Sequence, residues 1–124
     1  MTLLEFLLRL EGDIRRRLKP IRVTPLQAGV ILFFRRNAEA RVTDAAAALG
    51  VRLPTLRTVV KALVRTRWVT RHRSVKDDRV VCLQLSRRGQ VRAQSIEIQV
   101  RQVRTALTEY DGAALDISPQ GSCV

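Results

Sequence analysis

Apolar side chains recur at three- and four-residue spacing along most of this chain, which is the period of amphipathic helices. The first helical segment is predicted over residues 3–18, and Lys19 and Pro20 end it because proline cannot continue a helix. A second segment follows, in which Thr24 is the predicted N-cap and Pro25 the first helical residue. Its apolar residues surround most of the helix and predict that it is largely buried.

Two shorter helices are predicted next. An alanine-rich helix spans residues 44–49, with Thr43 as its N-cap and Gly50 as its C-terminal cap. Pro54 then starts a helix whose apolar face is formed by Leu56, Val59, Val60, Leu63 and Val64. Two helices of this length, separated by so short a turn, are typical of a helix-turn-helix, in which the second helix can lie in the major groove of DNA.

The period changes to two over residues 69–73 and 79–85, which predicts a β-hairpin with a polar tip at residues 74–78. In this pattern Cys82 faces the polar side of its strand. Ser86 is the predicted N-cap of a long helix that reaches about Tyr110. The tail, residues 111–124, contains two glycines and a proline and is predicted to fray.

The positive charge is concentrated in one part of the chain. Residues 52–92 hold twelve Lys and Arg and only two acids, Asp77 and Asp78, which gives +10 of the total net charge of +12. A surface that only keeps a protein soluble intersperses both signs. This clustering of positive charge therefore predicts a polyanionic partner. A basic helix-turn-helix with a hairpin wing favours double-stranded DNA as that partner.

Groove chemistry assigns roles to individual residues. Short side chains at the start of the second helix can touch base edges and methyl groups, whereas cations contact phosphates. On the wing, Arg79 is the predicted minor-groove contact, oriented by a charge-assisted hydrogen bond to Asp77. The complete set of predicted DNA-binding residues is Arg52, Pro54, Thr55, Arg57, Thr58, Lys61, Arg65, Arg71, Arg73, Lys76, Asp77 and Arg79.

Length and composition set the remaining limits. A chain of 124 residues, 46% hydrophobic and 4% aromatic, suits one mainly α-helical domain with a small β-hairpin wing. Two distant cysteines and one histidine predict neither a disulfide framework nor a metal site, and favour the cytoplasm. The apolar run near the N-terminus contains Glu5 and Arg9, so no membrane span is expected. No catalytic set or phosphate-binding glycine loop is present, so neither enzymatic activity nor a cofactor is predicted.

The residues also carry a specific resemblance. The run from Ala46 to Val51, the helix after Pro54, and the wing segment 77–86 with the following Gly89 resemble the winged helix-turn-helix of the MarR family of bacterial transcription regulators. The similarity covers residues 24–110. Its most specific part is the wing, where the family has Asp-x-Arg, alternating apolar residues and Leu-Thr-x-x-Gly.

The resemblance implies a homodimer that binds a pseudo-palindromic operator, often as a repressor relieved by a small hydrophobic or phenolic effector or by oxidation. It divides the single domain into an N-terminal dimerisation helix at 1–22, a DNA-binding core at 23–89, and a dimerisation helix with a tail at 90–124. The residues expected at the dimer interface are Leu3, Leu7, Leu10, Ile14, Val100, Val103 and Leu107.

The chain also departs from the family pattern. Arg67 stands where the family usually has glycine after the recognition helix, and Arg52 and Leu53 replace its usual Ser or Thr cap. The family's last dimerisation helix would begin near residues 115–119, about where the chain stops. Two alternatives therefore stay open beside a sequence-specific regulator. They are a nonspecific nucleic-acid-binding protein and an interaction partner of another regulator.

Overall fold

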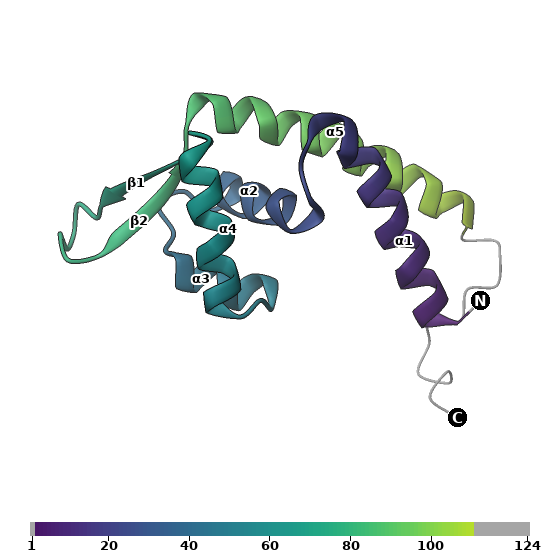
Figure 1. Cartoon of the computed structure of the whole chain (residues 1–124), viewed down its shortest axis with the longest axis horizontal. Helices are drawn as coiled ribbons and strands as arrows, with labels where there is room; N and C mark the ends of the chain where they lie inside the picture. Colours follow the sequence, from purple (N-terminus) through teal and green to yellow (C-terminus); the bar gives the residue numbers. More distant parts are fainter. Residues whose placement is uncertain (1, 111–124) are drawn as a thin grey trace. The chain divides into compact units, whose positions relative to one another are not determined.

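The computed structural model describes residues 2–110, and the side chains of residues 2–103. The described elements are the α-helices α1 (Leu3–Leu18), α2 (Pro25–Arg36), α3 (Val42–Leu49), α4 (Leu53–Arg65) and α5 (Arg87–Tyr110), a 3₁₀ turn η1 (Lys19–Ile21), and the strands β1 (Val69–Arg73) and β2 (Val81–Leu85) (Figure 1). The chain forms two compact units. We call residues 26–96 the core unit, and residues 1–25 with 97–124 the flanking unit.

The flanking unit contains α1 and the last part of α5. Helix α1 begins where Thr2 Oγ1 accepts a hydrogen bond from the amide of Glu5 at 3.1 Å, and it ends in η1, as the sequence predicted. Arg17 Nη1 donates to Gln102 Oε1 at 2.6 Å and joins the two helices of this unit. The predicted fraying of residues 111–124 lies outside the described residues.

In the core unit, α2 is the central helix. It buries five apolar side chains, and the rings of Phe33 and Phe34 meet edge to face at 5.3 Å between centroids. Helices α3 and α4 pack against one another, and α4 buries Leu56, Val60 and Leu63 at the predicted spacing. The predicted helix-turn-helix is therefore present, with Gly50 in the left-handed conformation (φ 65°) that ends α3.

The start of α3 differs from the sequence prediction. The helix begins at Val42 rather than Asp44, and Arg41 occupies the N-cap position that was assigned to Thr43. Asp44 is then the third helical residue, and its Oδ2 accepts the backbone N–H of Arg41 at 2.9 Å. A carboxylate in the first turn satisfies an open amide and favours the helix dipole, so it compensates for the missing hydroxyl cap.

Helix α4 begins at Leu53, one residue before the predicted Pro54, and ends in a left-handed turn at Arg67 (φ 65°). The amide of Trp68 donates to the carbonyl of Leu63 at 3.0 Å, and the amide of Arg67 donates to Val64 at 3.0 Å. This pair of hydrogen bonds is the Schellman motif, in which the left-handed position is usually glycine. The turn therefore has the usual geometry, although the side chain of Arg67 makes it less favourable.

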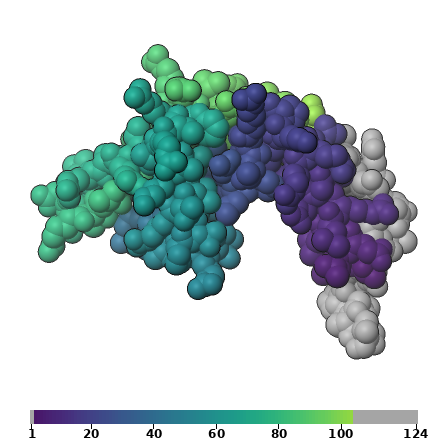
Figure 2. All heavy atoms as spheres, viewed as in Figure 1, coloured from purple at the N-terminus to yellow at the C-terminus, as the bar shows by residue number. Residues whose placement is uncertain are grey.

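Strands β1 and β2 form an antiparallel hairpin in which Val69 pairs with Leu85 and Arg73 pairs with Val81. In the space-filling view this wing projects from the rest of the core unit as a narrow arm (Figure 2). The second strand is shorter than predicted, because Arg79 and Val80 belong to the turn.

The position predicted for Cys82 is wrong, because the structure buries this side chain (5% exposed) and leaves Val81 46% exposed. Cys82 and Leu83 point to opposite faces of β2 and both are buried, so this strand is covered on both faces there and simple alternation fails. The segment between α2 and α3 is a further neighbour of β2. The amide of Leu83 donates to the carbonyl of Ala40 at 2.8 Å, so β2 has a neighbour on both edges instead of one. Alternation in sequence does not show this third segment.

The junction between the wing and α5 is closely packed around Gly89. Ser86 caps α5 as predicted, since its Oγ accepts the amide of Gly89 at 3.0 Å and donates to the carbonyl of Arg67 at 2.5 Å. A Cβ atom at Gly89 would lie 2.0 Å from the carbonyl oxygen of Trp68. The indole of Trp68 in turn lies 4.7 Å from the guanidinium of Arg92. These contacts fix where the wing leaves the helical core.

Candidate nucleic-acid interface

The exposed face of α4 carries the residues that the sequence predicted for base and phosphate contacts. Pro54, Thr55, Arg57, Thr58, Lys61 and Arg65 are all exposed on this helix, and Arg52 is exposed at its N-cap. Because the opposite face is buried in the core unit, this face is the one that α4 can present to a groove.

The start of α4 combines open amides with short side chains. No side chain caps this helix, and its first turn contains no acidic residue. The first amides of a helix have no intrahelical acceptor, and they attract anions together with the helix dipole. Thr58 Oγ1 donates to the carbonyl of Pro54 at 3.1 Å, so its hydroxyl proton is engaged and its methyl group is the part left for an apolar contact.

The wing tip is held by hydrogen bonds that fix Arg79. Asp77 Oδ1 accepts both the backbone amide of Arg79 at 3.0 Å and its Nε at 3.2 Å, while the Arg79 side chain is 88% exposed. The amide of Ser74 donates to Val80 O at 2.9 Å and closes the loop. The predicted contact between Asp77 and Arg79 is therefore present, and it projects a guanidinium from an ordered turn.

The other predicted wing cations are used differently. Arg73 Nη1 donates to the carbonyl of Asp78 at 2.7 Å, so Arg73 supports the turn. Lys76 is exposed at the tip, beside Val75, whose side chain is 93% exposed. Val75 was not predicted as a contact residue, because an isolated valine among polar residues carries no periodic signal.

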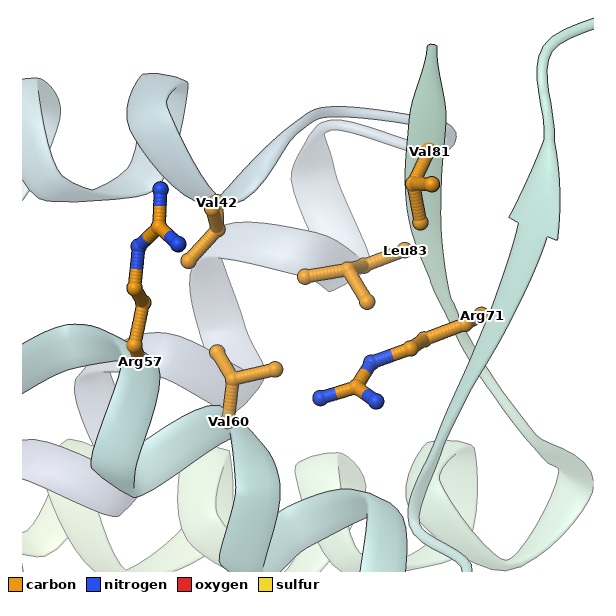
Figure 3. Close-up of a pocket in the computed structure, with 6 residues that line it drawn as sticks. All are labelled: Val42, Arg57, Val60, Arg71, Val81 and Leu83. Atoms are coloured by element: carbon orange, nitrogen blue, oxygen red, sulfur yellow. The ribbon is translucent and has the colours of Figure 1, made fainter. Parts of the chain in front are cut away.

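A cavity of about 300 Å³ lies between α4 and the wing. Its apolar walls are formed by Val42, Val60, Val81 and Leu83, and its two cations are Arg57 and Arg71 (Figure 3). Arg71 extends from β1 toward α4, whereas Arg57 extends from α4 toward Val42 at the start of α3. The sequence predicted both arginines as DNA contacts, but it did not predict that they share one cavity, since that depends on the position of the wing.

Most cations of this interface lack an ionic partner. Among the side chains that the structure describes, no ion pair involves Arg52, Arg57, Lys61, Arg65, Arg71 or Lys76. On α3, the amide and guanidinium of Arg41 hold the pKa of the Asp44 carboxyl below its ordinary value of 3.8. Unpaired cations on one face leave a strong positive field for a polyanion.

The residues predicted for a dimer interface lie in the flanking unit. Leu3 is 49% exposed and Leu7 48% exposed, while Leu10 and Ile14 are partly buried. On α5, Val100 is partly buried and Val103 is buried; the side chain of Leu107 lies outside the described ones. Leu4 and Leu8, 65% and 60% exposed, widen the apolar face of α1.

Three other structural features bear on function. No helix in the described part of the chain is long and apolar enough to cross a membrane. Within residues 2–110, no group of three or more His, Cys, Asp or Glu side chains is arranged to hold a metal ion. His72, which faces Cys82 across the hairpin, lies 3.6 Å from Glu39 through its Nε2 atom.

The chain is similar to known transcription regulators. A family model described as MarR family matches residues 23–80. The transcriptional repressor CouR bound to a 23-mer DNA duplex is 28% identical, with 90% of this chain and 79% of that chain covered at a TM-score of 0.81. No curated protein sequence matches this chain.

Two further structures share the fold at lower identity. CouR from Rhodococcus jostii RHA1 bound to p-coumaroyl-CoA is 18% identical, with 86% and 76% of the two chains covered and a TM-score of 0.81. A mutant of MarR from E. coli complexed with operator DNA is 24% identical, with 82% and 73% covered and a TM-score of 0.74.

Proposed function

We propose that the chain is a DNA-binding transcriptional regulator of the MarR family, and that it is a repressor that binds a pseudo-palindromic operator as a homodimer. The observation that carries this proposal is the combination of the exposed face of α4 with Arg79, which Asp77 fixes at the wing tip. A helix that enters the major groove and an arginine that enters the adjacent minor groove together read sequence and groove width.

The proposed roles follow the predicted boundaries. Residues 23–89 bind DNA, and residues 1–22 and 90–124 pair with a second copy. Exposed leucines on one face of α1 support the pairing, because an apolar stripe of this kind is stabilised by burial against another helix. Two copies related by a two-fold axis would place their recognition helices about one helical turn of DNA apart.

The proposed regulator responds to a small hydrophobic or phenolic effector. The support is the related fold of CouR, which has been seen with p-coumaroyl-CoA. An effector acts as a derepressor only if it binds the DNA-free form more tightly than the DNA-bound form. Thermal shift with a panel of phenolic acids and their thioesters, with and without DNA, tests this part of the proposal.

Selection of duplexes from a genomic DNA pool at about 0.15 M salt, followed by sequencing, tests the main proposal. We expect a two-fold symmetric motif, and light scattering of the complex is expected to give two copies of the chain per duplex. An enriched motif without symmetry would contradict the homodimer, but it would still support a sequence-specific regulator.

A nonspecific nucleic-acid-binding protein is the second candidate. It is favoured by the interface cations that have no ion pair among the described side chains, which are Arg52, Arg57, Lys61, Arg65, Arg71 and Lys76. Its signature is retention of duplexes that weakens steeply with salt and enriches no motif. Weak retention of every duplex would contradict both candidates and support a partner of another regulator.

A further inference from the structure

The cavity between α4 and the wing has a composition that neither solubility nor packing explains. Its floor is made of aliphatic side chains, of which Val81 is 46% exposed. Two guanidinium groups, from Arg57 and Arg71, lie at this floor without an ion pair among the described side chains. Both arginines are exposed, and two cations beside an apolar surface are complementary to an anion that lies at its opening.

The position of the cavity identifies the anion. In duplex DNA, one sugar-phosphate strand separates the major groove from the adjacent minor groove. A protein that places α4 in the major groove and its wing in the minor groove must therefore straddle that strand. The cavity lies between these two elements within one compact unit, so the strand has to pass its opening.

We propose that Arg57 and Arg71 form a clamp on a single backbone phosphate of the operator, and that the valines and leucine beneath them receive the adjoining deoxyribose. The inference rests on the proposed function, since it assumes that α4 and the wing dock on one duplex. Each guanidinium offers several N–H donors in a planar fork that matches phosphate oxygens, whereas the carbon face of a sugar suits an aliphatic floor.

The clamp has a consequence for how the wing is positioned. Arg71 is on the first wing strand and Arg57 is on the recognition helix, so one phosphate bound by both joins the two elements. Contacts to phosphate carry little sequence information, and they mainly fix the position and orientation of the protein on the duplex. The clamp is therefore a positioning device that sets where Arg79 meets the minor groove.

Salt dependence of binding to the selected duplex separates one shared phosphate from two independent ones. Each neutralised phosphate contributes about 0.9 to the slope of log K against log salt. Arg57→Gln and Arg71→Gln are each expected to lower the affinity about tenfold and to reduce the slope by at most about 0.9, because the other arginine still contacts the phosphate. In the double variant the slope is expected to fall by about 0.9 in total, because the same phosphate is lost, and the affinity to fall much less than about a hundredfold.

Lys61→Gln supplies the matched control, because Lys61 lies on the same exposed face of α4 but does not line the cavity. In the double variant that carries Lys61→Gln and Arg71→Gln, the loss of affinity is expected to equal the product of the two single losses. A slope that falls by about 1.8 in the Arg57 and Arg71 double variant, with multiplied losses of affinity, would overturn the clamp.

A second measurement locates the phosphate itself. Single neutral methylphosphonates are placed along one strand of the duplex, and the affinity of wild-type and variant protein is measured for each. One and the same position is expected to weaken wild-type binding most, and to have a clearly smaller effect in both arginine variants. Two different positions, one for each arginine, would contradict a shared phosphate.

These results are distinguishable from failure of the proposed function. If wild-type protein enriches no motif and binds all duplexes weakly, the regulator itself is refuted. If wild-type protein binds its motif tightly and the two arginines act independently, only the clamp is refuted.

Discussion

Replacing Gly89 by alanine tests the packing that joins the wing to α5. The added Cβ would lie 2.0 Å from the carbonyl oxygen of Trp68, 3.0 Å from its carbon and 3.3 Å from Leu85 Cβ. Two of these are backbone atoms, which cannot turn away as the end of a flexible side chain can. The two segments would have to separate by about 1 Å, which is a large displacement for a close-packed interior.

The cost can be worked from the contacts. Overpacking of this kind costs about 1–3 kcal/mol. The displaced carbonyl of Trp68 also accepts the amide of Ser86 at 3.0 Å, and losing that hydrogen bond costs about 1 kcal/mol. Removing a glycine from a helix returns about 0.5–1 kcal/mol. The net expected destabilisation is about 1–3.5 kcal/mol, or roughly 5–15 °C in the midpoint of thermal unfolding.

Urea and thermal unfolding at one fixed protein concentration measure this change. Gly29→Ala is the matched control, because a Cβ there meets only Leu49 Cδ2 at 3.8 Å and the residue lies inside α2. We expect the control to be neutral or slightly more stable than wild type. A Gly89→Ala protein with wild-type stability would refute the conclusion that this glycine is required by the close approach of the backbone.

Three further predictions concern charged residues. Arg79→Ala is expected to lower the affinity for the selected duplex by about tenfold with little change in thermal midpoint, since its side chain is 88% exposed; unchanged affinity would exclude the wing contact. Arg67→Gly is expected to raise the free energy of unfolding, measured in urea, by about 0.5–1 kcal/mol, because Arg67 has a φ of 65°, which glycine adopts without strain. Arg67→Ala retains the Cβ atom and should bring no such gain. The hydrogen bond from the amide of Arg41 lowers the pKa of Asp44 below 3.8, so its stabilising contribution is present above that value and is lost as pH falls through the lowered pKa. As pH falls below about 4, the free energy of unfolding of Asp44→Asn should therefore decrease less than that of wild type. Equal pH profiles in acid unfolding would contradict this role of the Asp44 carboxylate.

Local patterns predicted most of the helical structure. The boundaries of α1 and α5 and the cap at Ser86 agree with the sequence, because apolar periodicity, proline and hydroxyl caps act within a few residues of one another. The prediction failed at the start of α3, where a carboxylate three residues into the helix replaced the expected threonine cap. The two motifs satisfy different amides, because a Thr43 cap would accept the amides of residues 45 and 46, whereas Asp44 accepts the amide of Arg41. The sequence was compatible with both.

The candidate interface was predicted residue by residue but not as an arrangement. The exposed face of α4 and the pairing of Asp77 with Arg79 follow from helical spacing and from a two-residue turn contact. The use of Arg73 within the turn depended on a backbone carbonyl, which a sequence pattern does not display. The proposed DNA contacts themselves stay predictions until a duplex is bound.

The sequence by itself determined the order of the elements, the buried face of each helix and the concentration of positive charge, because these depend on spacing along the chain. Only the tertiary structure decided that Ala40 pairs with β2, that Cys82 is buried, that Gly89 lies against the backbone of Trp68, and that Arg57 and Arg71 share one cavity. Each of these contacts joins segments separated in sequence. Their distances are set by how the wing packs against the helical core, and local pattern does not contain that information.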